Sequence, residues 1–140
     1  MVVMERINAR YLDALPEAID LAVIDASFIS LALILPAVRG WFEGDKGRII
    51  ALIKPQFEAG RKAAAVHAGV IKDKAVHKRV LKETLASVKA LGFHPVGLIP
   101  SPIRGPKGNV EFLVDLLLKP QEVSPDVDGM IQQAIKDIPE

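Results

Sequence analysis

The 140-residue sequence contains no cysteine. This absence excludes disulfide bonds, thiolate zinc sites and a cysteine nucleophile together. The three histidines are scattered, and no pair has the helical spacing of metal ligands beside a carboxylate, so we expect no metal site. No serine stands in a G-x-S-x-G turn, so a hydrolase triad finds no support.

Long apolar runs are also missing. No stretch approaches the roughly 20 residues that a membrane-spanning helix needs, and the start "MVVMERINARYL" lacks the features of a signal peptide. Half of the residues are hydrophobic and a quarter are charged, as in ordinary globular domains. The net charge of +1 neither requires nor excludes a nucleic-acid partner. These features predict one cytoplasmic domain with a real core and no membrane partner.

Short apolar runs alternate with stretches of helical period, a pattern typical of an α/β domain with a mostly parallel sheet. Five runs are predicted to be strands: residues 1–4, 21–25, 48–54, 93–99 and 110–118. The segment 8–18 is predicted to be a turn and a short helix that stops near Pro16.

Two longer helices are predicted. The first spans residues 28–41, where Pro36 should kink or split it. The second spans residues 73–91 and has the clearest apolar stripe, with Asp73 as its N-cap and a glycine at its end. Residues 55–72 show no clear period and are predicted to be a long loop. A short amphipathic helix is predicted in the polar tail, over 127–138.

Polar residues follow or precede three of the predicted strands, and the stretch "ALIKPQFEAG" contains the most unusual of them. There an apolar strand runs straight into Lys54 and a proline. Asp25 ends the second strand and Glu111 stands at the start of the fifth. Since ligands of open α/β sheets bind beyond the carboxyl ends of the strands, one acid, one lysine and a second acid suggest a site.

Each of these residues also has a simpler interpretation. Asp25 could cap the following helix, Lys54 could be a strand-end lysine that extends into water, and Glu111 could be an ordinary exposed carboxylate. The loop "GPKGN" resembles a phosphate-binding loop only loosely, because it opens a strand and not a helix.

Five successive motifs, "ERINARYL", "IDASFISLALILPA", "LIKPQFEAGR", "AGVIKD..VH" and "SPIRGPKGNVEFL", span residues 2–113. In this order and spacing they resemble the hemolysin A (TlyA) family. Its members are S-adenosylmethionine-dependent ribosomal RNA 2′-O-methyltransferases of the FtsJ-like Rossmann class. The resemblance implies a methyltransferase that acts on ribosomal RNA or ribosomal subunits.

The resemblance also implies roles for single residues. The family has a Lys-Asp-Lys-Glu tetrad around the transferred methyl group, and its last three members fall on Asp25, Lys54 and Glu111. Asn8 and Arg10 fall where the family approaches the adenosine part of the cofactor. The two carboxylates would favour the charged form of Lys54. Its protonation state stays open, with orientation and electrostatics as the favoured role.

Some parts of the family pattern are missing from these 140 residues: the S4-type RNA-binding domain, the first tetrad lysine, and the glycine-rich strand-loop-helix. We therefore expect an incomplete Rossmann-like methyltransferase fold. Residues 1–120 would be the C-terminal part of the methyltransferase domain and 121–140 a tail. In this class the strands are arranged in the order 3-2-1-4-5-7-6. The five predicted strands would correspond to strands 3, 4, 5, 6 and 7, so the two central strands, 1 and 2, and the glycine-rich loop would be absent.

This incompleteness has consequences for activity and assembly. S-adenosylmethionine binding by this chain should be weak or lost, RNA binding should be poor, and the chain alone should be inactive. An uncovered sheet edge would favour a homodimer. The alternative function is a non-catalytic association module. A membrane-lytic role, which the hemolysin name implies, is disfavoured because no segment is amphipathic and basic enough.

Overall fold

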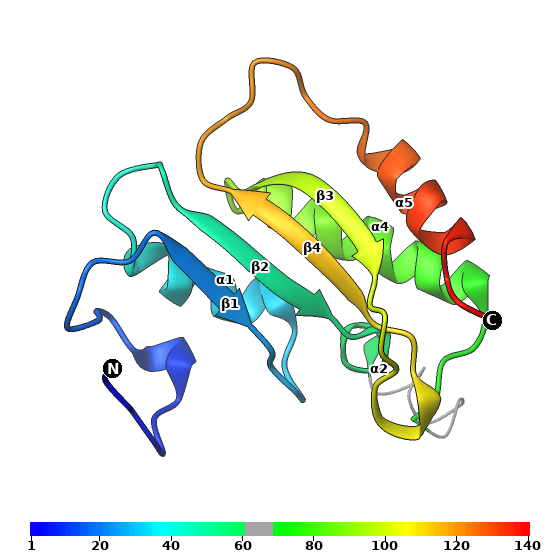
Figure 1. The fold of residues 1–140 in the computed structure, drawn as a ribbon, viewed down its shortest axis with the longest axis horizontal. Helices are drawn as coiled ribbons and strands as arrows, with labels where there is room; N and C mark the ends of the chain where they lie inside the picture. Colours follow the sequence, from blue (N-terminus) through cyan, green and yellow to red (C-terminus); the bar gives the residue numbers. More distant parts are fainter. Residues whose placement is uncertain (61–68) are drawn as a thin grey trace.

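The computed structural model describes residues 1–60 and 69–140. In the described residues one sheet contains four strands in the order β1-β2-β4-β3, as Figure 1 shows. The strands are β1 (Leu21–Ile24), β2 (Arg48–Ile53), β3 (His94–Pro100) and β4 (Phe112–Leu117). β1 and β2 are parallel, whereas β4 runs antiparallel to both of its neighbours.

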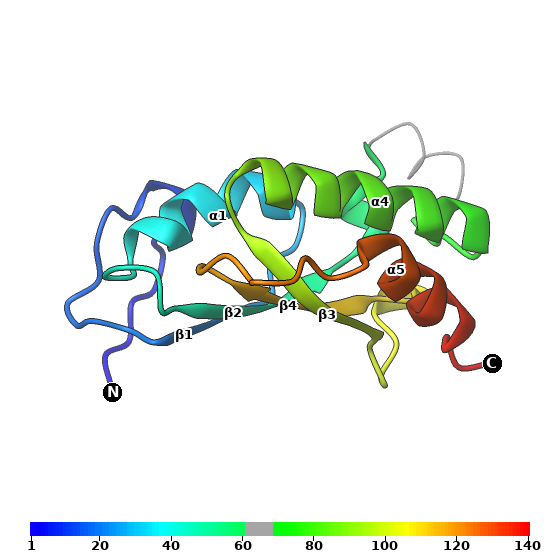
Figure 2. The ribbon, with the colours of Figure 1, turned by 90° about the horizontal axis from the view of Figure 1, so that it is seen from above.

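Figure 2 shows two of the helices, α1 and α4, on the same face of the sheet. The described helices are α1 (Leu31–Gly40), α2 (Pro55–Glu58), α4 (Lys74–Ala90) and α5 (Val127–Lys136), with short 3-10 turns η1 (Ala9–Tyr11) and η2 (Pro106–Gly108). The last helix, α5, packs against α4 and β3.

The core lies between the sheet and this helix pair, because alternate strand residues point to one face. Ile49, Ala51 and Ile53 of β2 and the matching residues of β4 are buried against it. The helices contribute fully buried residues such as Leu35 and Leu85. Burial of each such aliphatic side chain stabilises the fold by about 1.5–3 kcal/mol.

The opposite face of the sheet is apolar and largely open. Val23 of β1 is 73% exposed, Ile99 of β3 is 55% exposed, and Leu52 and Leu113 between them are half-buried. Leu113 pairs with Leu52 on one side and with Ile99 on the other, and Val23 pairs with Ile50 of β2 on the same face. The Arg48–Asp115 ion pair interrupts this apolar face. Figure 2 places no helix of the described residues over it.

Two predictions about the sheet are wrong. The sheet is not mostly parallel, because the direction of β4 is reversed relative to both neighbours. Residues 1–4 form no strand and are exposed, since no described strand lies beside them to pair with their backbone. The observed order matches positions 4-5-7-6 of the methyltransferase class, so the prediction for the remaining four strands is confirmed.

The helix predictions are mostly confirmed. The Asp73 side chain caps α4 by accepting from the Ala75 N–H, and the tail helix forms as α5. α1 is continuous through Pro36 and begins only at Leu31, because Ser30 is its N-cap. The predicted loop over 55–72 is wrong at its start, where α2 forms. The part of this prediction that concerns residues 61–68 lies outside the described residues.

Candidate active site

Three strand termini meet at one end of the sheet, the edge that carries Lys54. β1 and β2 end there because they are parallel, and β4 begins there because it runs the opposite way. The last pair of the β2–β4 ladder joins Ile53 to Phe112. Lys54 follows this pair on one strand, and Glu111 precedes it on the other. The antiparallel β4 thus places an acid beside the lysine at the same edge.

Lys54 and Asp25 form an ion pair, with 2.5 Å between Nζ and Oδ1. The Lys54 side chain is only 10% exposed, whereas that of Asp25 is 66% exposed. The ammonium also donates a hydrogen bond to Ser27 Oγ at 3.2 Å. Lys54 therefore does not extend into water. It is held below the surface with its charge directed at a carboxylate and a hydroxyl.

Glu111 is buried and forms no part of this ion pair. No ion pair joins it to Lys54 within the described part of the chain. Instead, Gln56 Nε2 donates to Glu111 Oε2 at 2.9 Å. A side chain at Gly105 would place its Cβ 2.4 Å from the same oxygen, so this carboxylate requires a glycine beside it. Glu111 is thus not an ordinary exposed carboxylate.

The helix-capping role considered for Asp25 is filled by another residue. Glu58 of α2 accepts hydrogen bonds from the Leu31 N–H at 2.7 Å and from the Ser30 hydroxyl at 2.8 Å. A carboxylate at this position satisfies an unpaired amide and interacts favourably with the helix dipole. Asp25 is therefore available for Lys54. Nothing in the sequence distinguished these two acids.

A groove of about 840 Å³ opens beside the edge. Phe28, Phe57 and Gln56 contribute to one wall, and Lys107 of η2 contributes to another. Phe28 is 89% exposed and has a φ of 61°, which is rare for a bulky residue. Its ring centroid lies 4.7 Å from that of Phe57.

Lys107 has a similar left-handed conformation, with a φ of 58°. Strained residues of this kind persist where the surrounding structure fixes them, and they cluster at binding sites. Sequence reasoning missed Phe28 and Lys107 because backbone strain leaves no signal in residue type. Gln56 was visible in the motif "LIKPQFEAGR", but its contact with Glu111 depends on the fold.

Asn109 fixes the loop that forms this wall. Its Nδ2 donates to the carbonyl oxygens of Gly69 and Pro106 at 2.8 and 2.9 Å, and its Oδ1 accepts from the Ile71 N–H at 3.0 Å. His77 Nε2 lies 2.9 Å from the Ile71 carbonyl oxygen. Burial lowers the pKa of His77, so its ring is neutral near pH 7 and Nε2 donates this bond. Asn109 and His77 thus both hold the backbone of Ile71, and the role of Asn109 is structural.

The two residues expected near adenosine make local contacts around η1. Asn8 Oδ1 accepts from the Arg10 N–H at 3.0 Å and so caps η1. The guanidinium of Arg10 lies 5.7 Å from the centre of the Tyr11 ring, and Arg10 also lines the groove. The structure brings Arg10 to the groove and leaves Asn8 in a local turn.

Features that commonly bind nucleotide cofactors and metals can be checked in the described residues. The sequence has no glycine-rich loop between a strand and a helix, and the first amide of α1 is already bonded to Glu58. Within residues 1–60 and 69–140, no three His, Asp or Glu side chains cluster as metal ligands do. No helix among these residues is long and apolar enough to cross a membrane.

Comparison with known proteins identifies the class. The model of the FtsJ-like methyltransferase family matches residues 1–117. The fold and the polar strand ends agree with this match, and the chain belongs to the FtsJ-like methyltransferase family.

Particular relatives refine this assignment. The chain is 43% identical, over 116 residues, to the 16S/23S rRNA (cytidine-2′-O)-methyltransferase TlyA of Mycobacterium tuberculosis. That match covers 81% of this chain and 42% of the relative. Hemolysin A of Brachyspira hyodysenteriae is 34% identical over 106 residues, which cover 76% of this chain and 42% of that protein.

A solved structure is also similar, that of a Lactococcus lactis protein proposed to be a hemolysin. It superposes with a TM-score of 0.80 at 42% identity, covering 94% of this chain and 65% of that one. The chain thus spans less than half the length of the two curated relatives described above. The resemblance to the hemolysin A family is confirmed.

Proposed function

We propose that the protein takes part in transfer of a methyl group from S-adenosylmethionine to a ribose 2′-OH of ribosomal RNA. Its proposed location is the cytoplasm, where ribosomal subunits would be its substrate. The observation that carries this proposal is the ion pair between buried Lys54 and exposed Asp25 at the sheet edge, next to the aromatic groove. The family match and the rRNA methyltransferase named among its relatives support it.

The chemistry of the reaction fits a fixed ammonium group. A ribose hydroxyl is a weak acid, so the site must orient its oxygen and stabilise the charge that develops as the proton leaves. Asp25 and Ser27 hold the Lys54 Nζ atom in one place. A lysine fixed in this way donates hydrogen bonds to an incoming oxygen without further reorganisation. Glu111, held by Gln56, provides a second polar group at this edge.

The groove offers an aromatic ring and positive charges, which an unstacked nucleotide can contact. Unstacked RNA bases stack on aromatic side chains, with a contribution of about 1–3 kcal/mol per base. Phe28 offers such a ring at the groove surface. Arg10 and Lys107 bring two positive charges to the same groove, where they would face phosphates.

The function is tested by methyl transfer from labelled S-adenosylmethionine to purified ribosomal subunits, with protein expressed from its full reading frame. We expect label in RNA fragments that resist alkaline hydrolysis, because a 2′-O-methyl group blocks attack on the neighbouring phosphate. Label that appears only on bases, or only on ribosomal protein, would contradict the proposal.

For the 140-residue chain alone we predict weak or undetectable binding of S-adenosylmethionine and no turnover. The reason is the missing glycine-rich loop, whose amides and helix terminus would otherwise hold the cofactor. Isothermal titration calorimetry measures this directly, with the protein from the full reading frame as the comparison. Micromolar affinity, about −8 kcal/mol, in the 140-residue chain would contradict the prediction.

We also propose a homodimer formed through the open edge of β1. Among the described residues, this strand pairs only with β2, and Leu21 and Val23 are exposed beside its free edge. An uncovered apolar edge strand pairs readily with a second chain. We expect light scattering to show a dimer that Val23→Lys converts to a monomer. A monomeric mass at high protein concentration would contradict this prediction.

A further inference from the structure

A small cavity lies at the other end of the strands, away from Lys54. It is formed by the end of α4, the start of β3 and the segment before α5, and its volume is about 120 Å³. His94 pairs with Leu117 at the last position of β4, and Arg48 at the start of β2 pairs with the same residue. The strands therefore separate this cavity from the candidate active site at the far end of β2.

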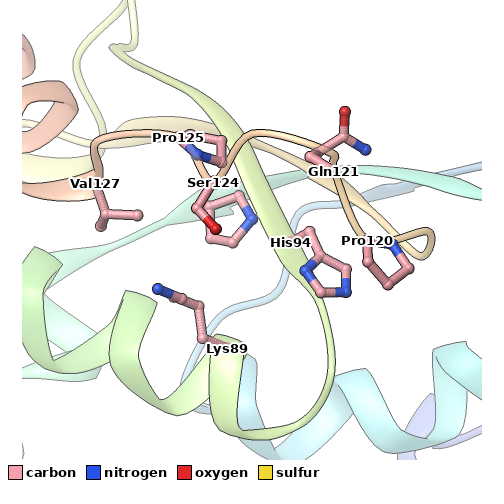
Figure 3. A pocket seen from close by; sticks show the side chains of 8 residues that line it. Lys89, His94, Pro120, Gln121, Ser124, Pro125 and Val127 are labelled. Atoms are coloured by element: carbon pink, nitrogen blue, oxygen red, sulfur yellow. The ribbon is translucent and has the colours of Figure 1, made fainter.

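The cavity is lined by several side chains that can donate hydrogen bonds and by no carboxylate. Its lining residues are Lys89, His94, Pro95, Pro120, Gln121, Ser124, Pro125 and Val127. Figure 3 shows Lys89 and His94 on one side and Ser124 across from them. Within the described part of the chain, the side chains of Lys89, His94 and Ser124 form no hydrogen bond or ion pair. Their donors are available to a ligand.

Two acids share a neighbouring groove with Lys89. Asp126 and Asp128 line a neighbouring groove together with Lys82 and Lys89, but neither forms an ion pair with Lys89. The carboxylate of Asp126 is engaged in capping α5 through the Gly129 N–H. Helix α4 has five basic residues and one acid, so its local charge is +4 in a chain with a net charge of +1. An anion that approaches this surface is favoured.

Prolines restrict the backbone of the cavity walls. Three prolines, at positions 95, 120 and 125, form much of its surface. Each ring fixes its own φ and carries no backbone N–H that would need a partner. A preformed wall lowers the entropy cost of binding. Its volume of about 120 Å³ corresponds to roughly four water molecules at about 30 Å³ each, so the cavity has room for one tetrahedral oxyanion.

We propose that this cavity binds a phosphate group through Lys89, His94 and Ser124. Phosphate oxygens accept from an ammonium, an imidazole N–H and a hydroxyl at once, and such charge-assisted hydrogen bonds are about twice as strong as neutral ones. The proposal concerns a second site, remote from Lys54, and does not depend on methyl transfer. Its failure therefore leaves the proposed function untouched.

Nuclear magnetic resonance of the chain tests this site. Amide signals are followed during titration with sodium phosphate and, separately, with sodium chloride at matched ionic strength. We expect saturable shifts at Lys89, His94, Ser124 and Val127 with phosphate only. Lys89→Gln and His94→Gln should each weaken binding about tenfold, since a hydrogen bond to a charged group contributes on that scale.

Lys78→Gln is the matched control. It removes the same charge from the same exposed helix but does not line the cavity. An equal loss of affinity in Lys78→Gln, or shifts that follow ionic strength alone, would overturn the proposal.

A short single-stranded oligoribonucleotide forms a further arm of the experiment. Shifts of the same signals at lower concentration than inorganic phosphate would identify the ligand as a nucleic-acid phosphate. Saturation by inorganic phosphate alone would identify a small phosphorylated molecule. Either result supports the site.

Discussion

Replacing Lys54 with alanine is expected to reduce methyl transfer to ribosomal RNA by about a hundredfold to ten-thousandfold, the usual contribution of a positioned acid–base group. The substitution removes the ammonium that Asp25 and Ser27 hold at the sheet edge. The methyl-transfer assay on ribosomal subunits, with protein from the full reading frame, measures the loss in kcat.

The fold should survive this substitution. Asp25 is 66% exposed, so water can solvate its carboxylate once Lys54 is gone. Circular dichroism and the thermal midpoint should therefore stay close to those of the unmodified protein. Lys78→Ala is the matched control, because it removes an exposed lysine that does not line the groove. If Lys54→Ala retained the activity of Lys78→Ala, the role proposed for Lys54 would be wrong.

The positions of two site residues could be predicted from the sequence, because they depend only on residue type and on position along a strand. Apolar runs that end in Asp25 and Lys54 placed these side chains beyond two parallel strands, and they lie there. Glu111 reaches the same edge for a reason that the pattern did not show. The apolar alternation of β4 reads the same in either direction, so its antiparallel pairing was not visible.

Other features depend on partners outside the local sequence. The run at residues 1–4 has the composition of a strand, but strands form only by pairing, and none lies beside it. The helix α2 was missed because four residues show no period, although Pro55 at its first position favours a helix start. The left-handed conformations of Phe28 and Lys107 are set by tertiary contacts, not by residue type.

The second large effect concerns stability, because Asn109 holds the loop beside the groove. Replacing Asn109 with alanine is expected to lower the free energy of unfolding by about 2–4 kcal/mol. The side chain is buried and makes three hydrogen bonds to backbone groups of Gly69, Ile71 and Pro106. Its loss leaves a buried N–H and two carbonyls without their partner. Urea unfolding followed by circular dichroism measures the change.

Two further variants separate this effect from a general sensitivity of the loops. Asn109→Asp keeps an acceptor for the Ile71 N–H but turns a carboxylate oxygen toward two carbonyls, so it should destabilise the fold at least as much. Gln121→Ala removes one exposed hydrogen bond to the Lys119 carbonyl and should change little. A midpoint shift in Asn109→Ala no larger than that in Gln121→Ala would show that the loop is held by other contacts. Because Gly69 and Lys107 also line the groove, the stability of this loop and the shape of the groove depend on the same amide.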